Sequence, residues 1–424
     1  MYITKVILEK VRNVKELSIE FEGQGEALLI AADNGEGKTT ILRGIAMGLC
    51  DESSASGLLR ELPGEYIRKR EKQATINIFL KNNDGVCYEI ETVIDKLPAF
   101  ERLKQNLWKL KNGERTTSPL NAEDFPWNDI FVCGYGAGRA PQGTGTGDID
   151  KYAPVHAVYS LFNYDDEMIN PELVIHRLLE KARKSAGEDA KRRKDRADKM
   201  LNHLTSILKI LLNLDPEDRV IMTEKGIEVK GHWGRNKFSS LGDGYKSMIT
   251  WIMDLLSWRM ISPRWSITPD KFSGIVLVDE IEQHLHPRWQ KNVMQLLRDT
   301  FPNLQFIVTT HSPLAVSGCK DCRVLSVKRG KLQFENAYGW LAEDVYAEVM
   351  DLSSSRAGAV ESKIKQYENL YLQKLKGTIS REDGVLLEEI EAKLKEFSLP
   401  DTRVISAKIK NLKKYLDQVG KDIQ

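Results

Sequence analysis

The feature that most constrains this chain is a glycine-rich turn placed between an apolar run and a helical pattern. The turn reads Ala-Asp-Asn-Gly-Glu-Gly-Lys-Thr over residues 32–39, after an apolar run over 27–30. Glycines let backbone N–H groups close around phosphate oxygens, a lysine reaches the terminal phosphates, and a threonine hydroxyl can bind Mg²⁺. The turn therefore predicts a phosphate-binding loop. Its predicted nucleotide-binding residues are Asn34, Gly35, Glu36, Gly37, Lys38, Thr39 and Thr40.

A later apolar run ends in the two carboxylates that such a site requires. Residues 275–278 are all apolar, and Asp279 and Glu280 follow them directly. This pattern is typical of a buried parallel strand, whose carboxyl end lies where ligands of open α/β sheets bind. We therefore expect Asp279 to hold Mg²⁺ together with Thr39. Glu280 is then placed to orient or deprotonate the attacking water.

Two further segments carry residues that could act on the nucleotide together with the phosphate-binding loop. His311 follows an apolar run over 305–308, and we predict that it senses the γ-phosphate through a hydrogen bond. Earlier, residues 241–244 read Leu-Gly-Asp-Gly just before a helical pattern. We call these four residues the signature segment. The N–H groups at a helix N-terminus favour anions, so Gly242 and Gly244 are candidate phosphate contacts. A plain helix cap is the alternative interpretation of both glycines.

Together these segments resemble the ABC-type ATPases of the SMC, RecF and OLD group. The specific marks are Asp-Glu-Ile-Glu-Gln-His-Leu-His-Pro-Arg-Trp-Gln over 279–290, Thr-His-Ser-Pro-Leu-Ala-Val-Ser over 310–317, and Asp-Gly-Tyr-Lys-Ser over 243–247. Residues 8–14 are also similar to the opening strand of RecF-like heads, where an arginine, here Arg12, lies near the nucleotide. The resemblance covers residues 1 to about 340, and it is weak from about 52 to 235.

The resemblance implies ATP as the ligand, Mg²⁺ as its partner, and a sandwich of two heads around two nucleotides. Thr39 and Asp279 would bind the metal, and Glu280 and His311 would act in hydrolysis. Gly242 and Gly244 would contact the γ-phosphate held by the second copy. The implied assembly is a homodimer or a higher homo-oligomer.

The chain departs from the pattern of this group at two positions. The group has a serine where Gly242 stands, and a glycine where Ala32 opens the phosphate-binding loop. Alanine resists the positive φ that glycine accepts freely. Both departures favour slow turnover, with ATP acting more as a conformational clamp than as fuel. The group's glutamine-bearing loop has no clear counterpart, and Gln142 is the nearest candidate.

The predicted fold class is α/β: a P-loop ABC-type ATPase head with a mixed core sheet, an antiparallel β extension, a helical insertion and a helical C-terminal tail. Residues 1–150 would form the first lobe with the phosphate-binding loop. Residues 151–235 would form a helical insertion and hairpin, and residues 236–340 the second lobe. Residues 341–424 would form a helical partner or oligomerisation region. A hairpin is also predicted where residues 75–80 and 86–90 flank Asn-Asn-Asp-Gly.

Composition is that of a cytoplasmic protein. The 424 residues carry a formal net charge of +1, which recruits neither nucleic acid nor membrane. No apolar stretch approaches the length of a membrane span, and the N-terminus has no signal-peptide pattern. Five cysteines without framework spacing indicate reduced thiols, and the pair Cys319 and Cys322 is expected to carry no redox or zinc chemistry.

Residues 181–199 carry the one notable charge run. It contains nine basic side chains, offset by Glu188, Asp189, Asp195 and Asp198. Such a helix could contact a nucleic acid backbone without sequence preference. A solvated face with ion pairs between residues four positions apart is the equally weighted alternative.

We expect this chain to differ from nucleases of the OLD type, because residues 341–424 contain no carboxylate motif of a Toprim domain. Stand-alone heads with a Gly-Tyr-Lys-Ser segment and a short helical tail resemble the ATPase subunits of bacterial anti-phage systems of the Septu and PARIS types. That resemblance implies an ATPase that controls a separate effector, a nuclease of the HNH or Toprim type. The alternative is a RecF-like or SMC-like ATPase that acts on DNA directly.

Overall fold

The computed structural model describes residues 1–33, 35–138, 153–166, 168–184, 189–223, 225–261, 272–328, 331–350 and 358–396. The chain divides into two units, Met1–Asp351 and Leu352–Gln424.

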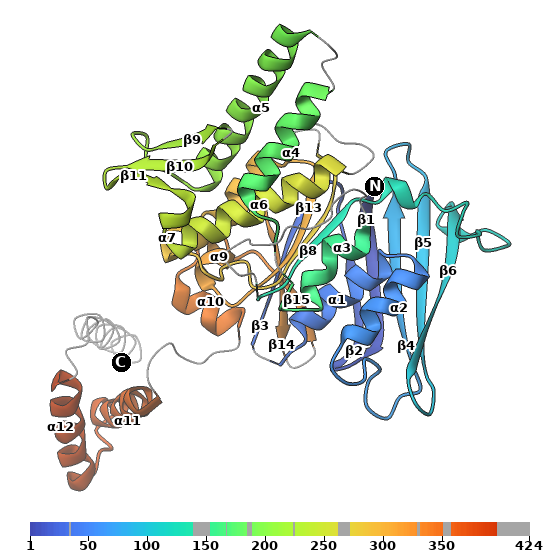
Figure 1. The fold of residues 1–424 in the computed structure, drawn as a ribbon. Helices are drawn as coiled ribbons and strands as arrows, with labels where there is room; N and C mark the ends of the chain where they lie inside the picture. The colour runs from blue at the N-terminus through green and yellow to red at the C-terminus, as the bar shows by residue number, and fades with distance from the viewer. Residues whose placement is uncertain are drawn as a thin grey trace. The chain divides into compact units, whose positions relative to one another are not determined.

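A six-stranded mixed sheet runs through the first unit in the order β15-β14-β3-β13-β12-β8 (Figure 1). Its strands are β3 (Ala27–Ala32), β8 (Val132–Tyr135), β12 (Gly274–Val278), β13 (Leu304–Thr310), β14 (Arg323–Lys328) and β15 (Lys331–Glu335). All neighbours run parallel except β15, which pairs antiparallel with β14. All six residues of β3 are buried, because helices or strands cover both faces of the sheet.

A second sheet is antiparallel and has the order β2-β1-β4-β5-β6-β7. Its strands are β1 (Tyr2–Val11), β2 (Val14–Glu20), β4 (Gln73–Lys81), β5 (Cys87–Lys96), β6 (Glu101–Lys111) and β7 (Glu114–Arg115). β4 and β5 pair from Gln73 opposite Asp95 to Lys81 opposite Cys87, so the predicted hairpin is confirmed. The helix α1 (Lys38–Gly48) packs between the two sheets, and Leu28 and Ile30 of β3 share a core with Ile76 and Ile78 of β4.

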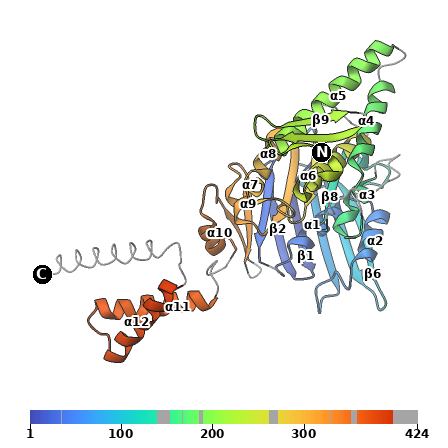
Figure 2. The same cartoon turned by 60° about the vertical axis from the view of Figure 1, so that its left-hand side comes forward.

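Helices cover the opposite face of the mixed sheet. They are α4 (Pro171–Lys184), α5 (Ala190–Leu211), α6 (Asp243–Ile261) and α8 (Val293–Thr300). A small antiparallel sheet of β9 (Arg219–Thr223), β10 (Gly226–Gly231) and β11 (Gly234–Lys237) packs beside α5. In Figures 1 and 2, α4 and α5 extend away from the sheets as an antiparallel pair. The remaining short helices are α2 (Glu52–Glu61), α3 (Pro154–Val158), α7 (Pro287–Gln290), α9 (Pro313–Ser317) and α10 (Ala342–Glu348), with 3-10 turns η1 (Trp127–Asp129), η2 (Tyr159–Leu161) and η3 (Phe238–Ser240).

The described part of the second unit, residues 358–396, contains the helices α11 (Gly358–Leu375) and α12 (Arg381–Glu396). Five buried residues join them, namely Ile364, Tyr367, Leu370, Leu387 and Ile390. The predicted α/β class, with its mixed sheet, antiparallel extension, helical insertion and helical tail, is confirmed. None of the described helices is long and apolar enough to cross a lipid bilayer.

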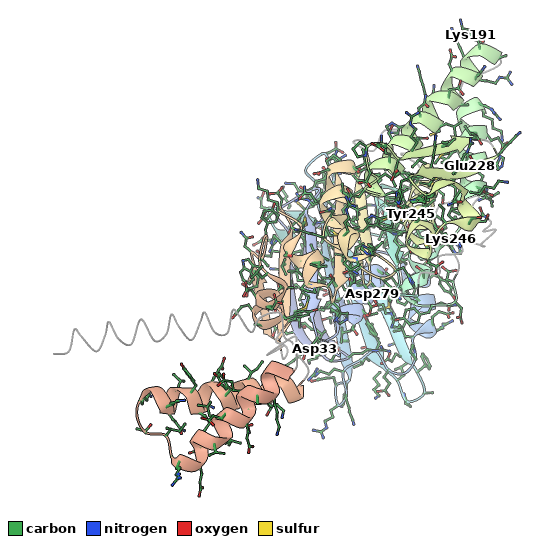
Figure 3. The ribbon with its side chains drawn as sticks, turned by 90° about the vertical axis from the view of Figure 1, so that its left-hand side faces the viewer. Asp33, Lys191, Glu228, Tyr245, Lys246 and Asp279 are labelled. Atoms are coloured by element: carbon green, nitrogen blue, oxygen red, sulfur yellow. A yellow bond between two sulfur atoms is a disulfide. The ribbon has the colours of Figure 1, made fainter. Side chains whose placement is uncertain are left out.

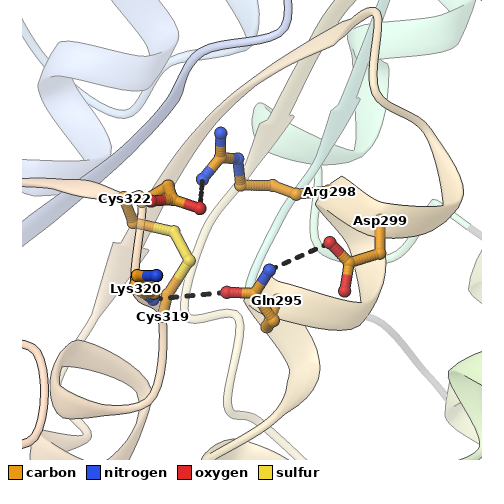
Figure 4. Close-up of a disulfide and its surroundings, with 7 residues drawn as sticks. Gln295, Arg298, Asp299, Cys319, Lys320 and Cys322 are labelled. Atoms are coloured by element: carbon orange, nitrogen blue, oxygen red, sulfur yellow. Dashed lines mark hydrogen bonds and ion pairs between the residues drawn. A yellow bond between two sulfur atoms is a disulfide. The ribbon is translucent and has the colours of Figure 1, made fainter.

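The expectation of reduced thiols is wrong for one pair of cysteines. Cys319 and Cys322 form a disulfide, and their Cα atoms lie 5.5 Å apart (Figure 4). Two intervening residues in the turn between α9 and β14 bring both side chains to one side of the chain, within the usual range for such a bond. The backbone N–H of Lys320, in the same turn, donates to Gln295. Cys50, Cys87 and Cys133 are free thiols.

A carboxylate lies in the core beneath the helical face. Asp254 of α6 is only 4% exposed and accepts hydrogen bonds from the Tyr135 hydroxyl and the Ile169 backbone N–H. Burial raises the pKa of Asp254 to about 6, although these two hydrogen bonds and one from Trp258 oppose the shift. Asp166 acts in the same direction as burial, because its charge repels the ionised form.

We therefore predict that the contribution of Asp254 to stability falls as the pH rises from about 4 to about 6. Over that range Asp254 binds more protons in the folded state than in the unfolded state. Its stabilising contribution is therefore complete at pH values below the pKa of the unfolded state, and it is lost as the pH rises through the pKa of the folded state. A shift of about two pKa units corresponds to about 3 kcal/mol. Asp254→Asn should flatten this dependence in urea unfolding. An equal pH slope in the variant and the wild-type protein would contradict the assignment.

Candidate nucleotide site

The phosphate-binding loop connects β3 to α1. Gly35 and Gly37 have φ values of +87° and +96°, which favour glycine. A Cβ on Gly37 would lie 2.7 Å from the Oδ1 atom of Asn13, so the loop also needs the small residue for space. Among the described residues, no side chain caps α1 and no acidic residue lies in its first turn. The N–H groups at this helix terminus are therefore available to an anion. Asn34 lies outside the described residues.

Lys38 lies at the first position of α1 and is only 6% exposed. Its Nζ atom donates to the carbonyl oxygens of Ala32 and Asp33, at 2.7 and 3.0 Å. Burial lowers the pKa of Lys38, and the nearby charges of Asp279 and Glu280 partly offset that effect. A phosphate group at this position would add its negative charge to those of the nearby carboxylates and help to neutralise the buried ammonium.

Ala32 does not strain the loop. It is the last residue of β3 and pairs with Val327 of β14, and its φ is not positive. The conformation that would penalise alanine is therefore not used at this position. The substitution for glycine gives no structural reason for slow turnover.

The metal-binding pair predicted from the sequence comes together across the mixed sheet. The Thr39 hydroxyl donates to the Oδ2 atom of Asp279 at 2.7 Å, although the residues are 240 positions apart in the chain. Asp279 is 2% exposed, and its other carboxylate oxygen accepts from the Thr309 hydroxyl. Thr309 lies on β13, next to β12. The two threonines therefore fix the orientation of the Asp279 carboxylate.

Glu280 and His311 follow the ends of the neighbouring strands β12 and β13. Glu280 has a φ of +49°, in the left-handed region, and its N–H donates to the Thr309 hydroxyl at 2.8 Å. Its carboxylate lies 3.9 Å from the Nε2 atom of His311. The Nδ1 atom of His311 lies 3.5 Å from the Lys38 ammonium. Non-glycine residues with positive φ cost free energy and cluster at functional sites.

Glu282 supports His311 and was not predicted from the sequence. Its carboxylate accepts hydrogen bonds from the Thr310 hydroxyl, at 2.7 Å, and from the His311 backbone N–H. Nearby, the Ser312 hydroxyl donates to the Gln290 side chain at 2.7 Å. The segment after β12 therefore holds the segment after β13 through polar side chains. Glu282 belongs to the run over 279–290, and its residue type and place in that run carry no local signal of this contact.

Asn13, rather than Arg12, contacts the phosphate-binding loop. Its side-chain amide donates to the Gly35 carbonyl oxygen, and it lines a cavity of about 440 Å³ together with Glu36 and Arg68. The Arg12 guanidinium donates instead to the carbonyl oxygens of Pro63 and Glu65. Arg12 is thus adjacent to the loop in sequence but held by the segment that precedes β4.

The two glycines of the signature segment differ in their surroundings. Gly242 is exposed, and a Cβ there would have no atom within 4 Å. At Gly244 a Cβ would lie 3.0 Å from the His284 carbonyl oxygen and 3.3 Å from the Trp289 ring. Thr40 is buried, and its main-chain carbonyl oxygen accepts from the Tyr66 hydroxyl, so a phosphate contact by its side chain stays a prediction.

The charge run over residues 181–199 lies in the helical insertion. Figure 3 places Lys191 at the outer end of α5, while Asp33, Tyr245, Lys246 and Asp279 lie in the body of the unit. Arg192 pairs with Asp189, and Lys184 pairs with Glu180. Contact of this run with DNA stays a prediction. Gln142, Glu188 and the glycine-rich residues 140–147 lie outside the described residues.

The donor set fits a nucleotide with Mg²⁺. The described residues contain no group of three or more His, Cys, Asp or Glu side chains arranged for a metal. Mg²⁺ at nucleotide sites takes one or two protein ligands, substrate phosphates and water. Thr39 and Asp279, beside an uncapped helix terminus, match that requirement.

Comparison with known protein families agrees with this geometry. The family model described as "AAA domain, putative AbiEii toxin, Type IV TA system" matches residues 33–317. The chain belongs to this AAA domain family. The match begins within the phosphate-binding loop and ends at the last residue of α9, so it includes Lys38, Asp279, Glu280 and His311.

Two relatives of this AAA domain protein carry informative names. "Septu protein PtuA" of Bacillus mycoides (strain KBAB4) is 24% identical over 335 residues, which cover 76% of this chain and 40% of the relative. "Retron Vc95 probable ATPase" of Vibrio cholerae serotype O1 biovar El Tor is 34% identical over 140 residues, 31% of this chain and 27% of the relative. The chain thus spans less than half the length of these two relatives. Among solved structures, the "SMC head domain from Thermotoga maritima" has a TM-score of 0.43 and 16% identity, and the match covers 79% of this chain and 99% of that one.

Proposed function

We propose that this chain is an ATP-binding and ATP-hydrolysing subunit of a bacterial anti-phage defence complex. One observation carries the proposal: the Thr39 hydroxyl, the Asp279 carboxylate, Glu280 and His311 meet beside the Lys38 ammonium, although they come from three separate segments of the chain. Membership of the AAA domain family supports nucleotide binding. The relatives named Septu and retron ATPase support the defence context.

Each residue has a defined task in this proposal. The N–H groups of the loop and of the first turn of α1 bind the phosphates, and Lys38 neutralises their charge. Thr39 and Asp279 would hold Mg²⁺, which would neutralise charge on the phosphate oxygens during transfer. Glu280 orients the attacking water and accepts its proton. His311, held by Glu282, donates a hydrogen bond toward the γ-phosphate.

Association of two copies is the finer part of the proposal. Gly242 is exposed at the N-terminus of α6, so it can approach a phosphate bound by another copy. Gly244 packs against His284 and Trp289 of its own chain, and any side chain there would also disturb that packing. Tests of association are therefore cleaner at Gly242.

Gly242→Ser is expected to strengthen ATP-dependent association by about ten-fold or more. The residue has open space and an ordinary φ, and serine is a favourable residue at a helix N-terminus. Its hydroxyl would restore the group that the SMC-like pattern places at the γ-phosphate, and one such hydrogen bond to a charged partner contributes about 1.5–3 kcal/mol. Light scattering during an ATP titration measures the effect. Weaker association than in the wild-type protein would argue against a phosphate contact at this position.

We further propose that the subunit controls a separate effector protein, which is a nuclease. The experiment is a phage plating assay with the complete operon, comparing the wild-type subunit with Glu280→Gln. Loss of protection with unchanged protein levels supports control by ATP. Full protection by the variant would mean that hydrolysis is not required for defence.

The alternative, direct action on DNA, is tested by a different measurement. An ATPase of that class is expected to hydrolyse ATP several-fold faster when DNA is added at low salt, because phosphate contacts are salt-dependent. A hydrolysis rate that DNA leaves unchanged supports the effector-controlling subunit.

A further inference from the structure

Tyr135, the last residue of β8, contacts both the end of the strand that leads to Asp279 and the helix α6 that begins at the signature segment. The backbone of Tyr135 lies beside the carboxylate-bearing strand, where Tyr135 pairs with Val278 and its carbonyl oxygen accepts from the Asp279 N–H at 2.8 Å. Its side chain points the other way, into the helical face. The Tyr135 hydroxyl donates to the Asp254 carboxylate of α6 at 3.0 Å.

Both partners of this hydrogen bond are buried, and each makes a further contact. Tyr135 is 2% exposed, and its ring meets the Trp251 ring of α6 edge to face, with centroids 5.7 Å apart. The second Asp254 oxygen accepts from the Ile169 N–H, which lies just before α4. A buried carboxylate costs several kcal/mol unless its hydrogen bonds are made, so this geometry resists displacement.

The helix α6 begins at the signature segment, and its rigid backbone transmits displacement along its length. A shift of the signature segment toward a second copy would therefore move Asp254. Because Tyr135 is bonded to Asp254 through its side chain and to Asp279 through its main chain, the shift would reach the metal-binding carboxylate. The backbone on both sides of Tyr135 is also held, since the Gly136 N–H donates to the Ser160 hydroxyl at 3.4 Å and that hydroxyl donates to the Gly134 carbonyl oxygen at 2.9 Å.

We propose that Asp254 and Tyr135 are positioning residues that couple the placement of the signature segment to the placement of Asp279. The proposal rests on the proposed ATPase function. It assigns Tyr135 and Asp254 no contact with the nucleotide.

Hydrogen–deuterium exchange of the nucleotide-free protein tests the coupling without ATP. Tyr135→Phe removes only the hydroxyl and keeps the ring against Trp251, and Asp254→Leu removes both acceptors. Each is expected to speed exchange several-fold in the peptide that contains the Asp279 N–H. Tyr88→Phe is the matched control, because Tyr88 lies on β5 of the antiparallel sheet and packs against Phe125. Unchanged exchange around Asp279 in both variants overturns the coupling, whatever the protein does with ATP.

Kinetics separate a positioning role from general destabilisation. Tyr135→Phe should lower kcat about ten-fold and raise the Mg²⁺ concentration for half-maximal rate, while the ATP Kd stays within about two-fold. Asp254→Leu should lose rate as Tyr135→Phe does, whereas Asp254→Asn should keep most of the wild-type rate. In the asparagine variant the side-chain amide N–H can donate to the Tyr135 oxygen, and the side-chain carbonyl can accept from the Ile169 N–H. Equal loss in Asp254→Asn and Asp254→Leu, or a parallel loss of ATP affinity, would overturn the proposal. Absence of hydrolysis in the wild-type protein would instead count against the proposed function.

Discussion

Replacing Lys38 with alanine is expected to weaken ATP binding by one to two orders of magnitude. The ammonium is the only cation whose position beside the loop is fixed by two hydrogen bonds to the loop itself among the described residues. Hydrogen bonds that involve a charged group contribute about 1.5–3 kcal/mol each, and ten-fold in affinity corresponds to about 1.4 kcal/mol. Isothermal titration with ATP measures the change.

Two controls make the result specific to the charge. Lys38→Met keeps the buried stem and removes only the ammonium, so it should match the alanine variant in affinity and exceed it in thermal stability. Lys104→Ala removes an exposed lysine of β6 and should leave the ATP Kd unchanged. Wild-type affinity in Lys38→Met would show that the ammonium does not bind phosphate.

Glu280→Gln is expected to retain ATP and lower kcat by at least about 100-fold. The amide keeps the size of the side chain but cannot accept a proton from water, and general-base catalysis contributes about 10²–10⁴ in rate. The left-handed backbone of Glu280 and its N–H bond to Thr309 should persist, since neither involves the carboxylate. Phosphate release at saturating Mg²⁺ and ATP measures the rate, and Glu61→Gln, on the exposed face of α2, is the control. A variant as fast as the wild-type protein would remove Glu280 from the catalytic role.

Local patterns account for much of the fold. The apolar runs before Lys38, Asp279 and His311 are long enough to be buried strands, and strands buried on both faces must lie parallel in one sheet between two layers. The turn at residues 82–85 likewise determines the β4–β5 hairpin, because its asparagine and glycine favour the tight conformation. The positions of Thr39 and Asp279 at one sheet edge follow from this topology.

Several contacts between side chains that are distant in the sequence could not be predicted from local patterns. Thr309 orients Asp279, and Glu282 holds His311, yet a threonine in a strand and a glutamate in a charged run carry no local signal of these roles. Asn13 resembles an ordinary turn residue, and only the packing of β1 against the loop brings it to Gly35. The disulfide was missed because two cysteines without a second pair are equally compatible with free thiols.

If two copies complete each other's nucleotide sites, as we propose, a mixing experiment tests this most directly. Lys38→Ala and Gly242→Asp are each expected to be inactive alone, the second because its carboxylate would repel the γ-phosphate. A mixed pair keeps one site with an intact Lys38 from one copy and an intact Gly242 from the other. Random pairing of equal amounts should therefore restore about a quarter of the wild-type hydrolysis rate. Addition of an equal amount of the double variant Lys38→Ala/Gly242→Asp to wild-type protein should instead lower the hydrolysis rate of the wild-type protein to about half, because both sites of such a mixed pair are defective. No recovery on mixing the two single variants would contradict the account.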